Sequence, residues 1–175
     1  MSRARSLKQL LENKRGASII EFAIVAPAFF AIVVAIIETS FMFLASDGLE
    51  TATENASRML LTGQAQRSGF DRSQFKTAAC ADLPSYLKCT NLMVDVQTSS
   101  NFSSAEVSPP VITYDIYGNV TNTFNYSPGS GGAIVVVRLM YLWPTLTGPL
   151  GFNLADQPRG KRLLVATSVI KAEAY

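Results

Sequence analysis

The sequence predicts an α+β protein, in which a long N-terminal helix, first transmembrane and then amphipathic, is followed by a small antiparallel sheet domain. Three observations predict this class. An apolar run of 19 residues extends from Ile19 to Ile37 and is interrupted only by Glu21. A helical stripe of apolar residues follows at 49–60. Segments rich in β-branched residues, typical of strands, lie at 92–97, 133–141 and 163–172.

The apolar run is long enough to cross a membrane once. At about 1.5 Å per helical residue, its 19 residues cover roughly 28 Å, close to the ~30 Å hydrocarbon thickness of a bilayer. A secretory signal peptide is the alternative, but its apolar region is normally about 7–15 residues and ends in a small-x-small cleavage site. The run is longer than that and no such site closes it, so the sequence favours a transmembrane helix.

Charge is concentrated before this run. Residues 1–16 carry five cations and one anion, a net charge of +4, whereas residues 17–175 carry 10 cations and 12 anions and sum to −2. Cations beside a span stay in the cytoplasm, which sends the rest of the chain across the membrane. We therefore expect a cytoplasmic basic leader at 1–16, a transmembrane helix at 17–45 and an extracytoplasmic domain at 46–175. Nucleic-acid binding is not expected, because it would need basic residues on the folded domain.

Glu21 is the unusual residue of the apolar run. A carboxylate at the centre of a spanning helix costs about 2.5–3.5 kcal/mol on insertion scales, and less near the edge. One explanation is that Glu21 stays hydrated near Lys14 and Arg15. The other is that the chain is cut after Gly16, because Ala17 would then provide an α-ammonium one helical turn before Glu21 and supply a partner within the chain or on a neighbour.

The segment "KRG" followed by "ASIIEFAIVAPAFFAIVVAIIE" resembles the N-termini of type IV prepilins. It most resembles the TadE-like minor pilins, or pseudopilins, of the tight-adherence (Tad/Flp) pilus. The matching residues are Arg15, Gly16, Glu21, Phe22, Pro27 and Glu38. The resemblance covers about residues 14–45 and is weak beyond them. Phe22 stands where major Flp pilins usually carry Tyr, and the chain is far longer than those subunits, which favours a minor pilin.

This resemblance implies a processed membrane protein. A prepilin peptidase would cut between Gly16 and Ala17 on the cytoplasmic side. The mature chain would be held in the bacterial inner membrane by a single span and would act with other Tad pilins and the pilus assembly machinery in surface adhesion.

Two further residues of the run are interpreted from their chemistry. Pro27 removes the hydrogen bond to the carbonyl of Ala23, which predicts a kink; the kink is either harmless or has a role in extraction or bundling. Glu38 lies 17 residues after Glu21, about 26 Å along a helix, and is interpreted as a marker of the opposite membrane interface.

The helix is expected to continue beyond the membrane. Its apolar stripe places Glu50, Glu54 and Arg58 on the other face; the residues of the stripe are Leu49, Ala52, Ala56, Met59 and Leu60. Gly48 is expected to loosen the join between the two halves. Gly63 is expected to end the helix.

The sequence of the rest of the chain predicts a small domain. Short helices are predicted at 71–80 and 82–89, broken near Pro84, and the stripe at 49–60 is predicted to cover one face of the three-stranded sheet. The Ser-, Asn-, Gly- and Pro-rich segment between the first two strands is expected to be mostly loop, with a hairpin near 117–119.

The chain has two cysteines, Cys80 and Cys89, and no histidine. Outside the cytoplasm the cysteines are expected to form a disulfide worth about 2–3 kcal/mol in the loop-entropy model, with free core thiols as the alternative. Without histidine there is no Ser-His or Cys-His pair, and a zinc site would need carboxylates. We expect no enzyme, metal or cofactor. A structural assembly protein is favoured over an anchored binding or scaffold domain and over an anchored enzyme.

Overall fold

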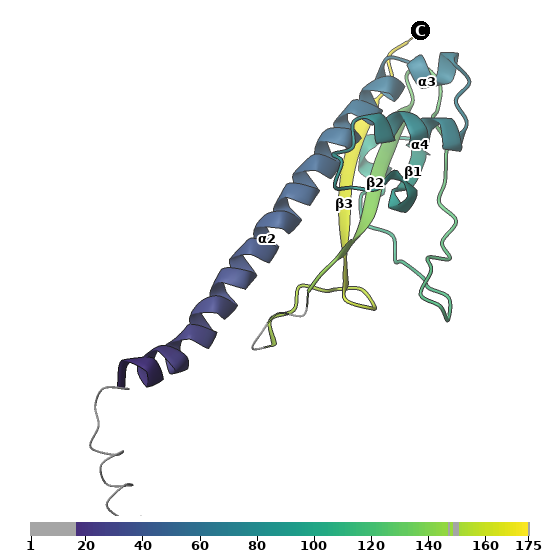
Figure 1. The fold of residues 1–175 in the computed structure, drawn as a ribbon. Coiled ribbons are helices and arrows are strands. Elements are labelled where there is room, and N and C mark those ends of the chain that lie inside the picture. Colours follow the sequence, from purple (N-terminus) through teal and green to yellow (C-terminus); the bar gives the residue numbers. More distant parts are fainter. Residues whose placement is uncertain (1–16, 147, 149–150, 175) are drawn as a thin grey trace, which may run out of the picture.

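The computed structural model describes residues 17–146, 148 and 151–174. The predicted leader at 1–16, including Gly16, lies outside these residues. The elements are a long helix α2 (Ala17–Leu61), a single helical turn α3 (Gln64–Arg67), a short helix α4 (Arg72–Ala81) and three strands, β1 (Met93–Ser99), β2 (Ile134–Pro144) and β3 (Lys161–Lys171). Figure 1 shows the sheet packed beside the C-terminal half of α2, while the purple N-terminal half extends away from the domain. This is the α+β fold that the sequence predicts.

α2 is one unbroken helix of 45 residues. It ends where Gly63 adopts a left-handed conformation, with φ of 68°, which glycine reaches without steric cost. The C-terminal segment of the chain meets this end, because the backbone N–H of Glu173 donates to the carbonyl of Leu61 at 2.8 Å. The predicted stop is therefore confirmed.

The sheet is antiparallel with the order β1-β2-β3, so β2 lies in the centre. Val94 pairs with Leu139, and Leu139 pairs with Ala166 on the other side. All seven residues from Val135 to Tyr141 are buried, as expected for a central strand covered on both faces. β2 ends and β3 begins at the end of the sheet that faces the N-terminal half of α2 (Figure 1).

One face of the sheet packs on α2 and forms the core. Leu49, Ala52, Ala56 and Leu60 are each at most 1% exposed, and Met59 packs at the edge of the same cluster. Glu50, Glu54 and Arg58 are exposed on the opposite side of the helix. The predicted stripe and its role as the cover of the sheet are confirmed. The sheet contributes Val135, Val137, Leu139, Tyr141, Leu164 and Ala166 to this core.

The segment between β1 and β2 covers the other face. Most of it is irregular, as predicted, and a turn at 115–118 lies between Tyr114 and Val120, which form an isolated antiparallel bridge. Further along, this segment lies against the free edge of β1, where Val96 donates to the carbonyl of Asn125 and accepts from the N–H of Ser127. The edge of β1 is thereby paired at Val96, which blocks this point of the edge against another strand.

A buried ion pair holds this segment in place. Arg138 Nη2 lies 3.0 Å from Asp95 Oδ2, and both side chains are at most 4% exposed. Asp95 also accepts hydrogen bonds from the backbone N–H of Asn125 and from the amide of Gln97, each at 2.8 Å. The other guanidinium arm of Arg138 donates to the carbonyl of Ser108. The pair thus fixes two distant points of the segment to the sheet.

α4 begins at a capping box. The Asp71 carboxylate accepts from the backbone N–H of Gln74, and the Gln74 side chain accepts from the N–H of Asp71. The hydrogen bond from the Gln74 backbone and that from the Ser73 hydroxyl lower the pKa of Asp71, because they stabilise the charged form. The predicted helix at 71–80 is confirmed, and Phe75 and Ala79 face the core.

The second predicted helical segment, 82–89, is wrong. Residues 84–87 form a turn closed by a hydrogen bond from the N–H of Leu87 to the carbonyl of Pro84, and a 3-10 helix spans only Cys89–Asn91. Proline and the disulfide explain the difference. Pro84 has no N–H to donate within a helix, and Cys89 is bonded to Cys80 with a Cα–Cα distance of 5.5 Å, which folds the segment back on α4.

The predicted loosening at Gly48 is also wrong, because the helix is continuous there and Gly48 is buried. A Cβ at this position would lie 2.6 Å from Pro84 Cγ and 2.9 Å from Tyr86 Oη. The Tyr86 hydroxyl in turn donates to the carbonyl of Leu44 at 3.1 Å. Gly48 is therefore a packing residue that lets the disulfide loop approach α2.

Gly48→Ala is expected to destabilise the domain. Alanine improves helix propensity by up to about 1 kcal/mol, but overpacking against the rigid proline ring costs about 1–3 kcal/mol. Chemical denaturation followed by tryptophan fluorescence measures the difference. Glu50→Ala, an exposed change two residues away on the same helix, is the matched control and should stay within about 0.5 kcal/mol of the wild type. A Gly48→Ala protein as stable as this control would contradict the packing role.

Candidate functional site

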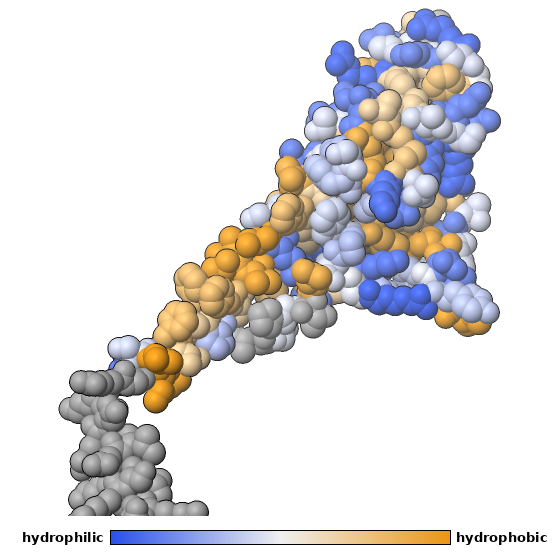
Figure 2. Space-filling view, viewed as in Figure 1, coloured by the Kyte–Doolittle hydropathy of each residue, from blue (hydrophilic) through white to orange (hydrophobic). Residues whose placement is uncertain are grey.

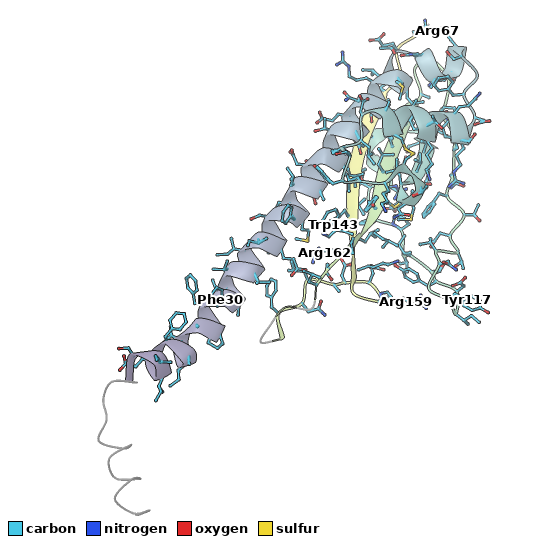
Figure 3. All side chains as sticks on the ribbon, in the orientation of Figure 1. Phe30, Arg67, Tyr117, Trp143, Arg159 and Arg162 are labelled. Atoms are coloured by element: carbon cyan, nitrogen blue, oxygen red, sulfur yellow. A yellow bond between two sulfur atoms is a disulfide. The ribbon has the colours of Figure 1, made fainter. Side chains whose placement is uncertain are left out.

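The N-terminal half of α2 is largely without cover in the described structure, apart from one strip where Ala31 and Glu38 are 7% and 8% exposed. We define the uncovered segment as residues 18–44 of α2. Most of its large apolar side chains are 37–73% exposed; they are Ile19, Ile20, Phe22, Ile24, Val25, Phe29, Phe30, Ile32, Val34, Ile36, Ile37, Phe41, Phe43 and Leu44. Figure 2 shows the face of this segment that is in view as mostly apolar, and in Figure 3 the side chain of Phe30 points away from the rest of the protein.

Apolar residues on every side of a helix indicate that the helix is buried in something other than water. Among the described residues, α2 is the one helix long and apolar enough to cross a membrane. Exposure of this surface to water would cost about 25 cal/mol of free energy per Å² of apolar area, relative to burial in an apolar environment. The structure is thus compatible with a single-pass membrane protein.

Glu21 lies inside the uncovered segment. Ala17 is the first residue of α2, so Glu21 follows it by one helical turn, about 6 Å along the axis. The Glu21 side chain is exposed and makes no hydrogen bond or ion pair within the described part of the chain. Gly16, the residue expected before the cleavage point, lies outside that part. The pairing of Glu21 with a cation therefore stays a prediction.

Pro27 lies inside α2, and the helix continues past it. Its side chain is exposed, like those of the apolar residues around it. The interruption of the hydrogen-bond ladder that proline imposes falls within the uncovered segment. A role for this position in bundling or extraction is not tested by the structure of one chain and stays a prediction.

Glu38 has a packing role in addition to its expected place at the membrane interface, which stays a prediction. It is 8% exposed, and its Oε1 accepts a hydrogen bond from the backbone N–H of Leu146 at 2.7 Å. Leu146 belongs to the loop that joins β2 to β3, so Glu38 ties this loop to α2. Its second oxygen, Oε2, is buried and has no hydrogen-bond partner among the described residues. No local pattern signals this contact, because the two residues are 108 positions apart.

The predicted site residues do not form one cluster. Ala17, Glu21 and Pro27 lie on the uncovered segment, whereas the disulfide between Cys80 and Cys89 lies in the domain beside β2. The disulfide loop is attached to β2 through the N–H of Lys88, which donates to the Tyr141 hydroxyl at 3.2 Å. The disulfide, which the sequence predicts, lies within the domain, and its loop touches the uncovered segment at its C-terminal end, where the Tyr86 hydroxyl donates to the carbonyl of Leu44.

These features define a class of protein, a small extended α+β domain carried on a helix that is apolar enough to span a membrane. The comparison with protein families adds a narrower likeness. Residues 16–58 match the family model described as TadE-like protein. The match covers α2 almost to its end and stops before α3, so it confirms the resemblance for the helix and does not extend to the sheet. It supports a protein associated with the Tad pilus system and with the membrane.

No curated protein and no solved structure matches the chain. The likeness to a known family is therefore limited to α2, and the role of the sheet domain has to be inferred from its structure.

Proposed function

We propose that this chain is a minor pilin, or pseudopilin, that takes part in building Tad adhesion pili and is not an enzyme. Its cations at residues 3–15 keep the N-terminus in the cytoplasm, and α2 holds it in the inner membrane with the sheet domain outside. A prepilin peptidase removes residues 1–16. The mature chain then associates with other Tad pilins and the assembly machinery through the uncovered segment.

The observation that carries this proposal is the coincidence of the family match with the uncovered segment. The TadE-like match begins at Gly16, the expected last residue of the leader, and includes all of residues 18–44. A helix that is apolar on every side suits both of the environments that a pilin meets, because lipid surrounds it before assembly and the helices of other subunits surround it afterwards.

Processing is the direct test. In Gly16→Leu the bulky side chain occupies the position where the peptidase requires glycine, so the variant should keep its leader and remain 16 residues longer than the wild-type chain. Intact-mass measurement of membrane-extracted protein, with N-terminal sequencing, distinguishes the two forms. Ala26→Leu, an apolar change within the span, is the control and should be cut normally. A wild-type chain that still begins at Met1, or a Gly16→Leu chain of mature mass, would remove the prepilin proposal.

A second candidate function is an anchored binding domain that is not processed. One observation favours it, a recess of about 550 Å³ at the end of the sheet nearest the uncovered segment. Its walls include the side chains of Lys88, Lys161 and Trp143, and none of the described residues that line it carries a carboxylate. Such a recess suits an anionic ligand. An uncut N-terminus at Met1 would favour this function over the first.

A further inference from the structure

A smaller pocket lies where the domain meets the uncovered segment. It has a volume of about 250 Å³. Six apolar residues line it. Val34, Ile37 and Phe41 belong to α2, and Trp143, Pro144 and Leu146 belong to the end of β2 and the loop after it. Figure 3 shows Trp143 between α2 and the end of the sheet that faces the uncovered segment. The pocket is therefore partly made of the helix that carries the predicted span.

Glu38 is the one charged residue among the described residues that line this pocket. Its Oε1 is held by the N–H of Leu146, and its Oε2 has no hydrogen-bond partner within the described part of the chain. A buried carboxylate oxygen without a donor is costly, because the group has lost its water. The last torsion of a glutamate is broad and roughly two-fold, so a small rotation turns Oε2 toward the pocket while Oε1 keeps its bond.

The pocket lies at the depth of lipid headgroups. Ile37 ends the apolar run and Glu38 follows it, so the pocket coincides with the boundary between acyl chains and headgroups if α2 spans the membrane. Tryptophan is enriched at this boundary. The exposed walls, including Phe41 at 57% and Leu146 at 69%, suit the start of an acyl chain.

We propose that this pocket binds a phospholipid with a primary ammonium headgroup, such as phosphatidylethanolamine. The ammonium donates a hydrogen bond to Glu38 Oε2 and neutralises its charge, while the apolar walls contact the beginning of one acyl chain. A choline headgroup lacks N–H donors and leaves Oε2 unpaired. The bound lipid would fill the space between α2 and the loop after β2, and would set the height of the domain above the membrane. This inference rests on the membrane-spanning part of the proposed function and not on the role in pili.

The chain contains a single tryptophan, Trp143, which lines this pocket and reports on it directly. The full chain is reconstituted in phosphatidylcholine vesicles that contain increasing fractions of a lipid with brominated acyl chains, which quench tryptophan fluorescence on contact. The quencher is either brominated phosphatidylethanolamine or brominated phosphatidylcholine. Half-maximal quenching should need about tenfold less of the ethanolamine lipid, the ratio that one hydrogen bond to a charged group produces at the lower end of its usual range.

Glu38→Gln is the decisive variant. Its side-chain oxygen can still accept from the N–H of Leu146, but an amide N–H₂ replaces Oε2, so the acceptor for the ammonium is lost while the tie to the loop is kept. The preference for the ethanolamine lipid should disappear in this variant. Glu50→Gln, which neutralises an exposed carboxylate on the same helix outside the span, should keep it.

Several results would overturn the proposal. Equal quenching of the wild type by both lipids does so, and so does an unchanged preference in Glu38→Gln. Fluorescence that depends on protein density in the vesicles but not on lipid type would mean that a neighbouring subunit supplies the donor. If Glu38→Gln does not fold, the difference in quenching of wild-type Trp143 fluorescence by the two lipids still tests the proposal. Flotation of the protein with the vesicles separately tests the membrane span, so a failure of the anchor is distinguished from a failure of lipid binding.

Discussion

Replacement of Arg138 by Met is expected to lower the free energy of unfolding of the domain by about 3–5 kcal/mol. The change leaves the Asp95 carboxylate in the interior without its cation, and a buried charge that loses its partner is penalised by this amount. It also removes the hydrogen bond from the guanidinium to the carbonyl of Ser108. Denaturant titration of the detergent-solubilised full chain, followed by Trp143 fluorescence, measures the loss.

Two further variants show whether the stranded charge is the cause. In the double variant Asp95→Asn with Arg138→Met, the interior holds no charge at this point, and the side-chain carbonyl of the new asparagine still accepts from the N–H of Asn125. It should therefore be more stable than Arg138→Met alone. Arg58→Met removes an exposed arginine from α2 and should change the stability by no more than about 0.5 kcal/mol. A double variant less stable than the single one would show that the hydrogen bonds of Arg138, rather than charge compensation, are what matters.

Replacement of Glu21 by Gln is expected to stop pilus assembly while leaving the protein in the membrane. The glutamine keeps the shape of the side chain and removes its charge. In the proposed assembled state the carboxylate meets a cation, most simply the ammonium of Ala17 on the same or an adjacent subunit. In the low dielectric of a helix bundle, loss of one partner strands the other at a cost of about 3–5 kcal/mol. The measurements are co-purification of partner pilins and a count of surface pili.

The matched control for this variant is Glu50→Gln, which removes a carboxylate from the exposed face of the same helix. It should assemble normally. Both variants should be found in the membrane fraction and should be cut after Gly16, because both leave the apolar residues of the run and the junction between Gly16 and Ala17 unchanged. Normal pili and normal partners in Glu21→Gln would mean that Glu21 is only a charge tolerated near the membrane surface.

The elements whose sequence signal is local were predictable. The apolar run, the stripe at 49–60 and the β-branched strands each carry their own periodicity, and Gly63 marks the end of α2. The same holds for the short cysteine spacing that the disulfide closes. The failures, at 82–89 and at Gly48, have a common origin. Both depend on how the disulfide loop folds back against α2, which no pattern within a few residues reports.

The residues of the candidate site also fall into two groups, those with a local sequence signal and those without one. Ala17, Glu21 and Pro27 are singled out because they interrupt or adjoin an apolar run, which is a one-dimensional signal, and their roles stay predictions. The role of Glu38 was missed, because its partner, the N–H of Leu146, comes from the far end of the chain. The ion pair of Asp95 and Arg138 was missed for the same reason, since a charge within a strand shows its burial only when the opposite strand is in place.

For a chain exported as proposed, the position of β3 determines when the domain can finish folding. β3 follows β1 and β2 in the sequence of the described residues; it pairs with β2 and packs on α2, with Leu164 and Ala166 in the core. In the proposed topology, α2 is anchored first and its stripe faces water until residues 161–171 have crossed the membrane. Contacts between the two ends of a chain form late, since the loop that joins them must be closed first. In that topology the domain therefore stays open, and exposed to proteases and chaperones outside the cytoplasm, until β3 has emerged.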